Sequence, residues 1–126
     1  MKQTGEIPLG QQGETLASRY LSRQGYRVIL RNYRTKQGEI DIVAEEQGVL
    51  VFVEVKTRRS QQCGHPFEAV TPAKCRQISK AALQYLAETG REGQPARFDV
   101  VAISFSGENA PVVELVKNAF DLSYGV

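Results

Sequence analysis

The sequence predicts an α+β domain in which helices flank a mixed β-sheet of about five strands. Hydrophobic periodicity gives the element order α-β-β-β-α-β-β, and three successive strands followed by a helix and another strand favour mixed pairing. The length of 126 residues fits one domain over 1–126 that buries a core without disulfides or metal. A hydrophobic fraction of 41% and a charged fraction of 24% exclude a wholly disordered chain.

The first elements are a helix, a strand, a turn and a second strand. Helical spacing of apolar residues predicts a helix over about 9–24, and Gly25 stands where a C-terminal glycine cap belongs. A strand is expected over 26–33, followed by turn residues at 35–38. Residues 39–45 alternate with strand period, which predicts the second strand.

The strongest strand prediction falls on residues 49–57, which are dense in β-branched side chains. A two-residue hairpin loop at 47–48 is expected to connect it to the preceding strand, because glycine at the second position accepts positive φ. Residues 58–70 read as a loop that contains serine, glycine and proline.

The C-terminal half is expected to hold a helix and two strands. Thr71 as N-cap and Pro72 at the first helical position start the helix, and Gly90 ends it. The two strands are expected over 97–105 and 111–116.

The charge balance and the compartment signals are both weak. Sixteen basic and 14 acidic residues give a formal charge of +2, which is too small to indicate a nucleic-acid partner. No apolar run approaches the roughly 18 residues of a membrane helix, and no signal-peptide core follows Met1, so a cytoplasmic location without a membrane partner is expected. Residues 1–8 are expected to form a flexible segment. Cys63, Cys75 and His65 do not make the usual four-ligand zinc site, and a disulfide is disfavoured in the cytosol.

Four charged residues fall on one face of the predicted hairpin. With the loop at 47–48, antiparallel pairing sets Asp41 opposite Glu54 and Glu39 opposite Lys56. Glu54 and Lys56 are two residues apart on one strand, so they share that face. The expected result is an acidic cluster with one ammonium group, unless a β-bulge shifts the register.

This cluster interrupts the most hydrophobic strand of the chain. Burying charge costs several kcal/mol unless the charge is paired or bound to metal. A divalent cation relieves repulsion between close carboxylates, and carboxylate oxygens suit Mg²⁺, which favours phosphate-bearing substrates. A lysine beside such a cation can orient or deprotonate a water, or stabilise phosphate charge. The pattern favours metal-assisted phosphodiester hydrolysis, and a solvated ion pair is the alternative that spacing leaves open.

At these residues the sequence resembles known nucleases. Asp41 followed by Glu54-Val55-Lys56 after a short hairpin is similar to the signature of the PD-(D/E)xK nuclease superfamily, although Ile40 stands where the superfamily's name has proline. The longer stretch of sequence from about Gly10 to Phe120 resembles the YraN-like family of predicted endonucleases, which is thought to be related to archaeal Holliday-junction resolvases. The motifs that carry this resemblance are Gly10–Glu14, Arg31–Arg34, Gly38–Asp41 and Phe52–Arg58.

The resemblance implies a restriction-endonuclease-like core that uses Mg²⁺ or Mn²⁺. Asp41 and Glu54 match the metal-binding carboxylates and Lys56 matches the catalytic lysine. Glu14 matches an acidic residue that completes the metal site in resolvase relatives, with the helix dipole as its alternative explanation. Glu39 is expected beside these ligands, with an ion pair to Lys56 as its alternative role. Resolvase relatives act as dimers, so a homodimer stays open.

Basic residues group around the acidic cluster along the chain. Those expected to bind nucleic-acid phosphates are Arg31, Arg34, Lys36, Arg58, Arg59, Lys74, Arg76 and Lys80. Each alone is better explained as a solvated surface residue, and their grouping around the acidic cluster carries the prediction. No base-reading helix is evident, so binding directed at the backbone or the DNA structure is expected. Asp99 interrupts an apolar strand, and structural hydrogen bonding is its favoured explanation.

Three hypotheses follow. The leading one is a metal-dependent endonuclease that acts on DNA in preference to RNA, with branched or otherwise structured DNA as a candidate substrate. The second is a non-catalytic nucleic-acid-binding module that keeps the nuclease fold. The third is a structural partner protein whose charges form ion pairs alone.

Overall fold

The computed structural model describes residues 7–59 and 70–121 of the chain. Its elements are α1 (Leu9–Arg23), β1 (Arg27–Arg34), β2 (Glu39–Glu46), β3 (Val49–Arg58), α2 (Pro72–Thr89), β4 (Ala96–Ser104) and β5 (Val112–Phe120). The predicted order is confirmed. Most of the predicted N-terminal segment and of the 58–70 loop, with Cys63 and His65, lies outside the described residues. Within those residues, neither helix has the length and apolarity needed to cross a bilayer.

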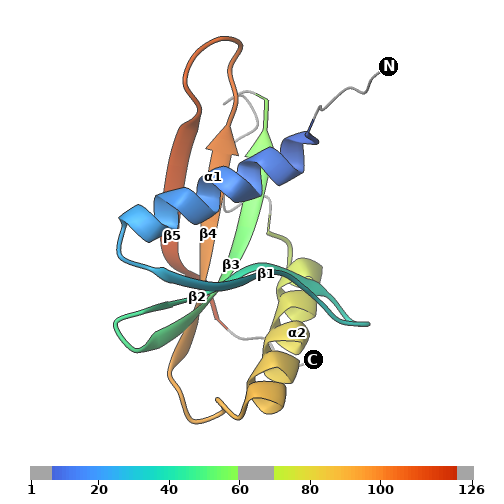
Figure 1. Cartoon of the computed structure of the whole chain (residues 1–126). Coiled ribbons are helices and arrows are strands. Elements are labelled where there is room, and N and C mark those ends of the chain that lie inside the picture. Colours follow the sequence, from blue (N-terminus) through green and yellow to red (C-terminus); the bar gives the residue numbers. More distant parts are fainter. Residues whose placement is uncertain (1–6, 60–69, 122–126) are drawn as a thin grey trace.

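The five strands form one mixed sheet in the order β1-β2-β3-β4-β5. All neighbouring pairs are antiparallel except β3 and β4, which run parallel because α2 connects them as a crossover. Figure 1 shows α1 lying across the sheet and α2 lying beside the turn that joins β1 and β2. This topology makes β3 the central strand, as its composition predicts.

The two helices cover opposite faces of the sheet. Leu50 and Phe52 of β3 pack in one core with Ile78 and other α2 residues. Val51 and Val53 point the other way and pack in a second core with Leu21 of α1. Adjacent residues on β3 thus point into opposite cores, one on each face of the sheet. This is the α/β/α arrangement that the sequence predicts.

The helix ends follow the expected capping chemistry. The Thr71 side chain accepts a hydrogen bond from the backbone N–H of Lys74 over 3.2 Å, and Pro72 takes the first helical position. Gly90 closes α2 with a φ of 68°, and Gly25 follows α1 with a φ of 96°. Both predicted glycine caps are confirmed.

The last strand is longer than predicted. The sequence places it over 111–116, whereas β5 runs from Val112 to Phe120. The pattern is obscured because an irregularity in the pairing sets three residues of β5, Lys117, Asn118 and Ala119, opposite the single β4 residue Asp99, with Asn118 at a φ of 55°. Pairing resumes at Phe120, whose ring stacks on that of Phe98 with centroids 4.6 Å apart.

The predicted hairpin register is confirmed over its described pairs. Glu46 pairs with Val49, Ala44 with Val51, and the ladder runs on to Ile42 and Val53. Gln47 and Gly48 both have positive φ, as a two-residue hairpin loop requires. This register fixes which residues of β2 lie beside the polar end of β3.

Candidate functional site

β2 and β3 diverge at Asp41. Their register pairs end at Ile42 and Val53, and beyond them the backbone N–H of Val55 donates to Oδ2 of Asp41 over 2.8 Å. Ile40 packs in the α2-side core and Ile42 in the α1-side core, although regular alternation would put both on one face. The strand therefore twists at Asp41, and a carboxylate stands where the ladder would place a backbone carbonyl.

The structure brings Asp41 and Glu54 together. Glu54 is 5% exposed, and its carboxyl group is within hydrogen-bonding reach of that of Asp41. Burial and the charge of Glu54 raise the pKa of Asp41 to about 7, against the lowering effect of the Val55 N–H. Burial also raises the pKa of Glu54, although Lys74 opposes this. The pair resists double ionisation and thus attracts positive charge.

Two lysines lie near the Asp41 and Glu54 carboxyl groups, and only one of them forms an ion pair there. The ammonium of Lys74, on the first turn of α2, is 3.4 Å from Oε2 of Glu54. Lys56 is close enough for its charge to lower the pKa of Glu54, yet it forms no ion pair within the described part of the chain. The sequence assigned Lys74 to phosphate binding, and its contact with a candidate metal ligand is an additional finding.

Glu14 reaches the same region from α1. Gly13 makes this approach possible, because a Cβ there would lie 2.1 Å from Oγ1 of Thr57 on β3. Burial, and then the charge of Asp41, raise the pKa of Glu14, while Arg31 holds it in an ion pair at 3.8 Å. α1 thus places a third carboxylate, that of Glu14, near Asp41 and Glu54.

These acidic side chains do not converge on one point. Among residues 7–59 and 70–121, no three cysteine, histidine or carboxylate side chains form a group that could hold a metal ion. Glu39 is near enough for its charge to affect Asp41, but its ion-pair partner is Arg34 at 3.6 Å. The alternative pairing of Glu39 with Lys56 is therefore not the one observed.

Asn32 is a site residue that the sequence analysis missed. Its side chain hydrogen-bonds to Glu14, and its backbone has a φ of 57° within β1. Asparagine tolerates this left-handed conformation better than most residues. The sequence does offer a signal for this residue. Asn32 lies inside a predicted strand, directly after Arg31, which pairs with Glu14.

The predicted phosphate-binding residues fall into two groups. Those paired with a carboxylate in the described residues are Arg31, Arg34, Arg58 and Lys74. Those with no such ion pair there are Lys36, Arg59, Arg76 and Lys80. Arg58 differs from the rest, because its side chain is 17% exposed and contacts Ser104 on β4 and Glu114 on β5. Phosphate binding by these residues stays a prediction.

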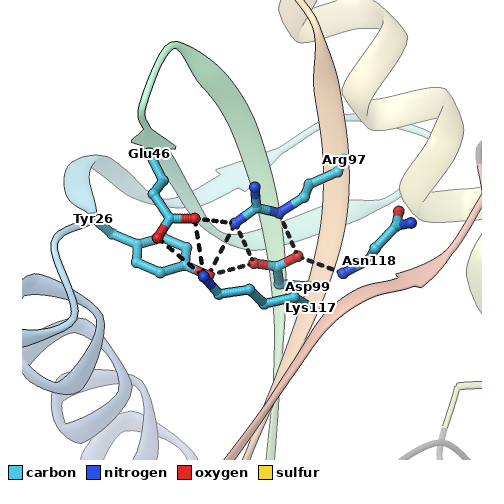
Figure 2. Close-up of polar contacts among 6 residues, drawn as sticks. All are labelled: Tyr26, Glu46, Arg97, Asp99, Lys117 and Asn118. Carbon is cyan, nitrogen blue, oxygen red and sulfur yellow. Dashed lines mark hydrogen bonds and ion pairs between the residues drawn. The ribbon is translucent and has the colours of Figure 1, made fainter.

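Asp99 has a structural role, as predicted. It is fully buried and accepts hydrogen bonds from the Tyr26 hydroxyl over 2.7 Å, from Arg97, and from the backbone N–H of Asn118 over 2.9 Å. Figure 2 shows how Glu46 extends this cluster by contacting Arg97 and Lys117. The network fastens β2, β4, β5 and the start of β1 to one another and leaves no acceptor on Asp99 for catalysis.

The fold and the carboxylate pair together define an α/β/α domain whose polar centre lies where two strands of the sheet separate. The family model described as "Uncharacterised protein family UPF0102" matches residues 13–103. The chain belongs to the UPF0102 family, and the resemblance to the YraN-like family is confirmed.

Relatives of similar length support this membership. A UPF0102 protein of Geotalea uraniireducens is 52% identical over 116 residues, which cover 92% of this chain and 91% of the relative. A UPF0102 protein of Geobacter sulfurreducens is 54% identical with the same coverage of each chain. Their names state no activity.

Two solved structures are more distantly similar. One is a complex of EndoMS with double-stranded DNA, with 19% identity and a TM-score of 0.46. The other is a repair endonuclease from Pyrococcus abyssi, with 16% identity and a TM-score of 0.40. In each case the match covers 85% of this chain and 42% of the solved chain, so this chain spans about two fifths of those proteins.

Proposed function

We propose that this chain is a divalent-metal-dependent endonuclease that hydrolyses phosphodiester bonds in DNA. The observation that carries the proposal is the contact between the half-buried carboxyl group of Asp41 and the buried carboxyl group of Glu54, where β2 leaves β3. Two close carboxylates that resist ionisation together are stabilised by a divalent cation. The buried position on a central strand also makes a purely solvated ion pair a poor explanation.

The donor set fits Mg²⁺ or Mn²⁺. Asp41 and Glu54 offer hard oxygen ligands, and Mg²⁺ commonly takes one or two carboxylates and keeps waters or phosphates for its other positions. A group of three protein ligands is therefore not required, and Glu14 is near enough for the charge of Asp41 to raise its pKa. When bound, the cation supplies charge neutralisation at the phosphate and lowers the pKa of a water.

The remaining steps belong to side chains of the chain itself. The Val55 N–H fixes the Asp41 carboxylate, which keeps one ligand in a single orientation. Among the residues that the structure describes, the ammonium of Lys56 has no ion-pair partner, so it is available to donate to a phosphate oxygen or to orient the attacking water. Glu14, whose pKa is raised by burial and by Asp41, is suited to accept a proton from that water.

The preference for DNA over RNA, and for branched or otherwise structured DNA, rests on the resemblance to archaeal Holliday-junction resolvases. That resemblance also motivates the homodimer, which presents two sites to a branched substrate. Both belong to the proposal, as does a cytoplasmic location.

A cleavage assay tests the function. Branched, single-stranded and duplex DNA, with an RNA of the same sequence, are incubated with the protein in Mg²⁺, Mn²⁺ or EDTA. We expect metal-dependent cleavage of DNA that is lost in the double variant Asp41→Ala, Glu54→Ala and kept in Glu92→Gln, an exposed carboxylate on the turn before β4. Cleavage that survives in the double variant would refute the mechanism.

One observation favours the second candidate, a non-catalytic nucleic-acid-binding module. In the described residues the three acidic side chains do not converge as a ready ligand group. Such a module binds DNA with salt dependence, without requiring a cation and without cleavage. Calorimetric titration of Mg²⁺ into wild type and Asp41→Asn separates the two, because uptake that depends on Asp41 is expected of the nuclease alone.

A further inference from the structure

A shallow cleft of about 400 Å³ lies between the β1–β2 turn and the first half of α2. Its lining includes three cations, Arg34, Lys36 and Lys74, against one carboxylate, Glu39. No aromatic ring of the described residues lines it. The cleft is therefore polar and mainly basic, and Lys74 places it directly beside Glu54.

Close packing builds this cleft. Gly38 touches α2 so tightly that a Cβ would lie 2.6 Å from the backbone oxygen of Gln77. The Thr35 hydroxyl accepts hydrogen bonds from the backbone N–H groups of Gln37 and Gly38, each over 3.0 Å. These contacts fix the turn against the helix and leave Lys36 exposed at its tip.

Lys74 connects the cleft to the carboxylate pair. Its side chain is 42% exposed, whereas that of its partner Glu54 is 4% exposed. A cation in the first turn of a helix is disfavoured by the helix dipole, so local helix stability does not explain this lysine. Its position is explained by the anions that it meets.

We propose that this cleft binds a backbone phosphate of the nucleic acid next to the bond that is cut. We further propose that Lys74 passes from Glu54 to this phosphate when a divalent cation binds the carboxylate pair. The inference rests on the proposed function. A cation at Glu54 replaces the charge that Lys74 provides there, and the released ammonium is already in the wall of the cleft. Because the cleft offers charge and no ring for base stacking, it recognises the backbone independently of sequence.

Equilibrium binding tests the exchange without using activity. Anisotropy of a short fluorescein-labelled duplex is measured in EDTA and in Ca²⁺, with two unrelated sequences, and the duplex is checked to be intact afterwards. We expect Lys74→Ala to bind like wild type in EDTA and roughly tenfold more weakly in Ca²⁺, with a salt-dependence slope lower by about 1. Lys36→Ala should weaken binding in both media, and Arg23→Ala, at the far end of α1, in neither.

Glu54→Gln gives the reciprocal test. Removing the charge that holds Lys74 should let this variant bind DNA in EDTA as tightly as wild type does in Ca²⁺. The double variant Glu54→Gln, Lys74→Ala should lose that gain. Lys74→Gln, which can still hydrogen-bond to Glu54, serves as a second variant should Lys74→Ala lower the thermal stability.

The outcomes separate this inference from the nuclease proposal. Equal losses for Lys74→Ala in EDTA and Ca²⁺, or no loss in Ca²⁺, would overturn the exchange even where wild type cleaves DNA. A preference for one duplex sequence that depends on Lys36 would overturn backbone recognition by the cleft. A wild-type protein that binds neither Ca²⁺ nor duplex would overturn the nuclease proposal together with the exchange.

Discussion

Replacing Asp41 with asparagine is expected to stabilise the metal-free protein at alkaline pH. Asparagine keeps the acceptor for the Val55 N–H and can donate its amide to the carboxylate of Glu54. It removes the negative charge that burial and Glu54 make unfavourable. The substitution thus keeps both hydrogen bonds and removes the repulsion.

The magnitude and the pH range follow from the pKa of Asp41. It is raised from 3.8 to about 7 in the folded protein, and each unit corresponds to about 1.4 kcal/mol. Stability from the protonated group is present near pH 4 and is lost as the pH rises through about 7. The full shift would correspond to about 4 kcal/mol, and partial exposure and coupling to Glu54 reduce our expectation to about 2 kcal/mol.

Thermal unfolding followed by circular dichroism in EDTA measures this effect. For a domain of this size, about 2 kcal/mol corresponds to a Tm increase of roughly 6–10 °C near pH 8, falling to none near pH 4. Mg²⁺ should raise the Tm of wild type and leave the Tm of Asp41→Asn unchanged, so the Tm difference between the two proteins becomes smaller. Glu92→Gln removes an exposed carboxylate and should show no such pH profile.

Two results would refute this reasoning. A Tm for Asp41→Asn at or below that of wild type near pH 8 would mean that the carboxylate pair is not repulsive in the folded protein. An equal gain near pH 4 and pH 8 would mean that ionisation of Asp41 is not the cause.

Three further predictions concern the contacts that hold the site in place. Gly13→Ala should destabilise the protein by about 2 kcal/mol in thermal unfolding, because its Cβ meets Oγ1 of Thr57 at 2.1 Å, and Thr57→Ala in the same chain should recover part of the loss. Asp99→Asn should cost about 3 kcal/mol in urea unfolding, since a neutral amide would replace the fully buried carboxylate that accepts from Tyr26, Arg97 and the Asn118 N–H, whereas Tyr26→Phe should cost about 1 kcal/mol. Gly38→Ala should weaken duplex binding by several-fold with little change in Mg²⁺ uptake, because it displaces the turn from α2 while the carboxylate pair stays intact. Unchanged stability in the first two cases, or unchanged duplex binding in the third, would contradict the packing described.

The carboxylate pair could be predicted because its geometry is local. A two-residue loop with glycine at its second position fixes the hairpin register, and the register places Asp41 beside the polar end of β3. The twist at Asp41 could not be predicted in this way. It depends on Ile40 and Ile42 packing in different cores, and those cores are formed by helices from distant parts of the chain.

The helix contributions to the site depend on tertiary contacts that sequence patterns do not encode. Gly13 shows that α1 meets something closely, but its partner, Thr57, lies 44 residues further along the chain. Lys74 is indistinguishable by pattern from any other exposed lysine on a helix. It lies at Glu54 because the crossover sets the first turn of α2 at the end of β3 where the carboxylates lie.

The formal charge of +2 hides an uneven distribution, and that distribution bears on the function. At the hairpin end of the sheet, acidic and basic groups pair off: Glu45 contacts Arg27 and Arg91, and Glu46 contacts Arg97 and Lys117. Around the carboxylate pair the balance differs. Within the described residues, Lys56, whose charge lowers the pKa of Glu54, and Lys36, which lines the cleft with Lys74, have no carboxylate partner. A cation at Asp41 and Glu54 would release Lys74 and offset the local negative charge, so the positive field at this end would increase when metal binds. Affinity for a phosphate backbone should then rise with metal binding, which couples the two parts of the proposed site.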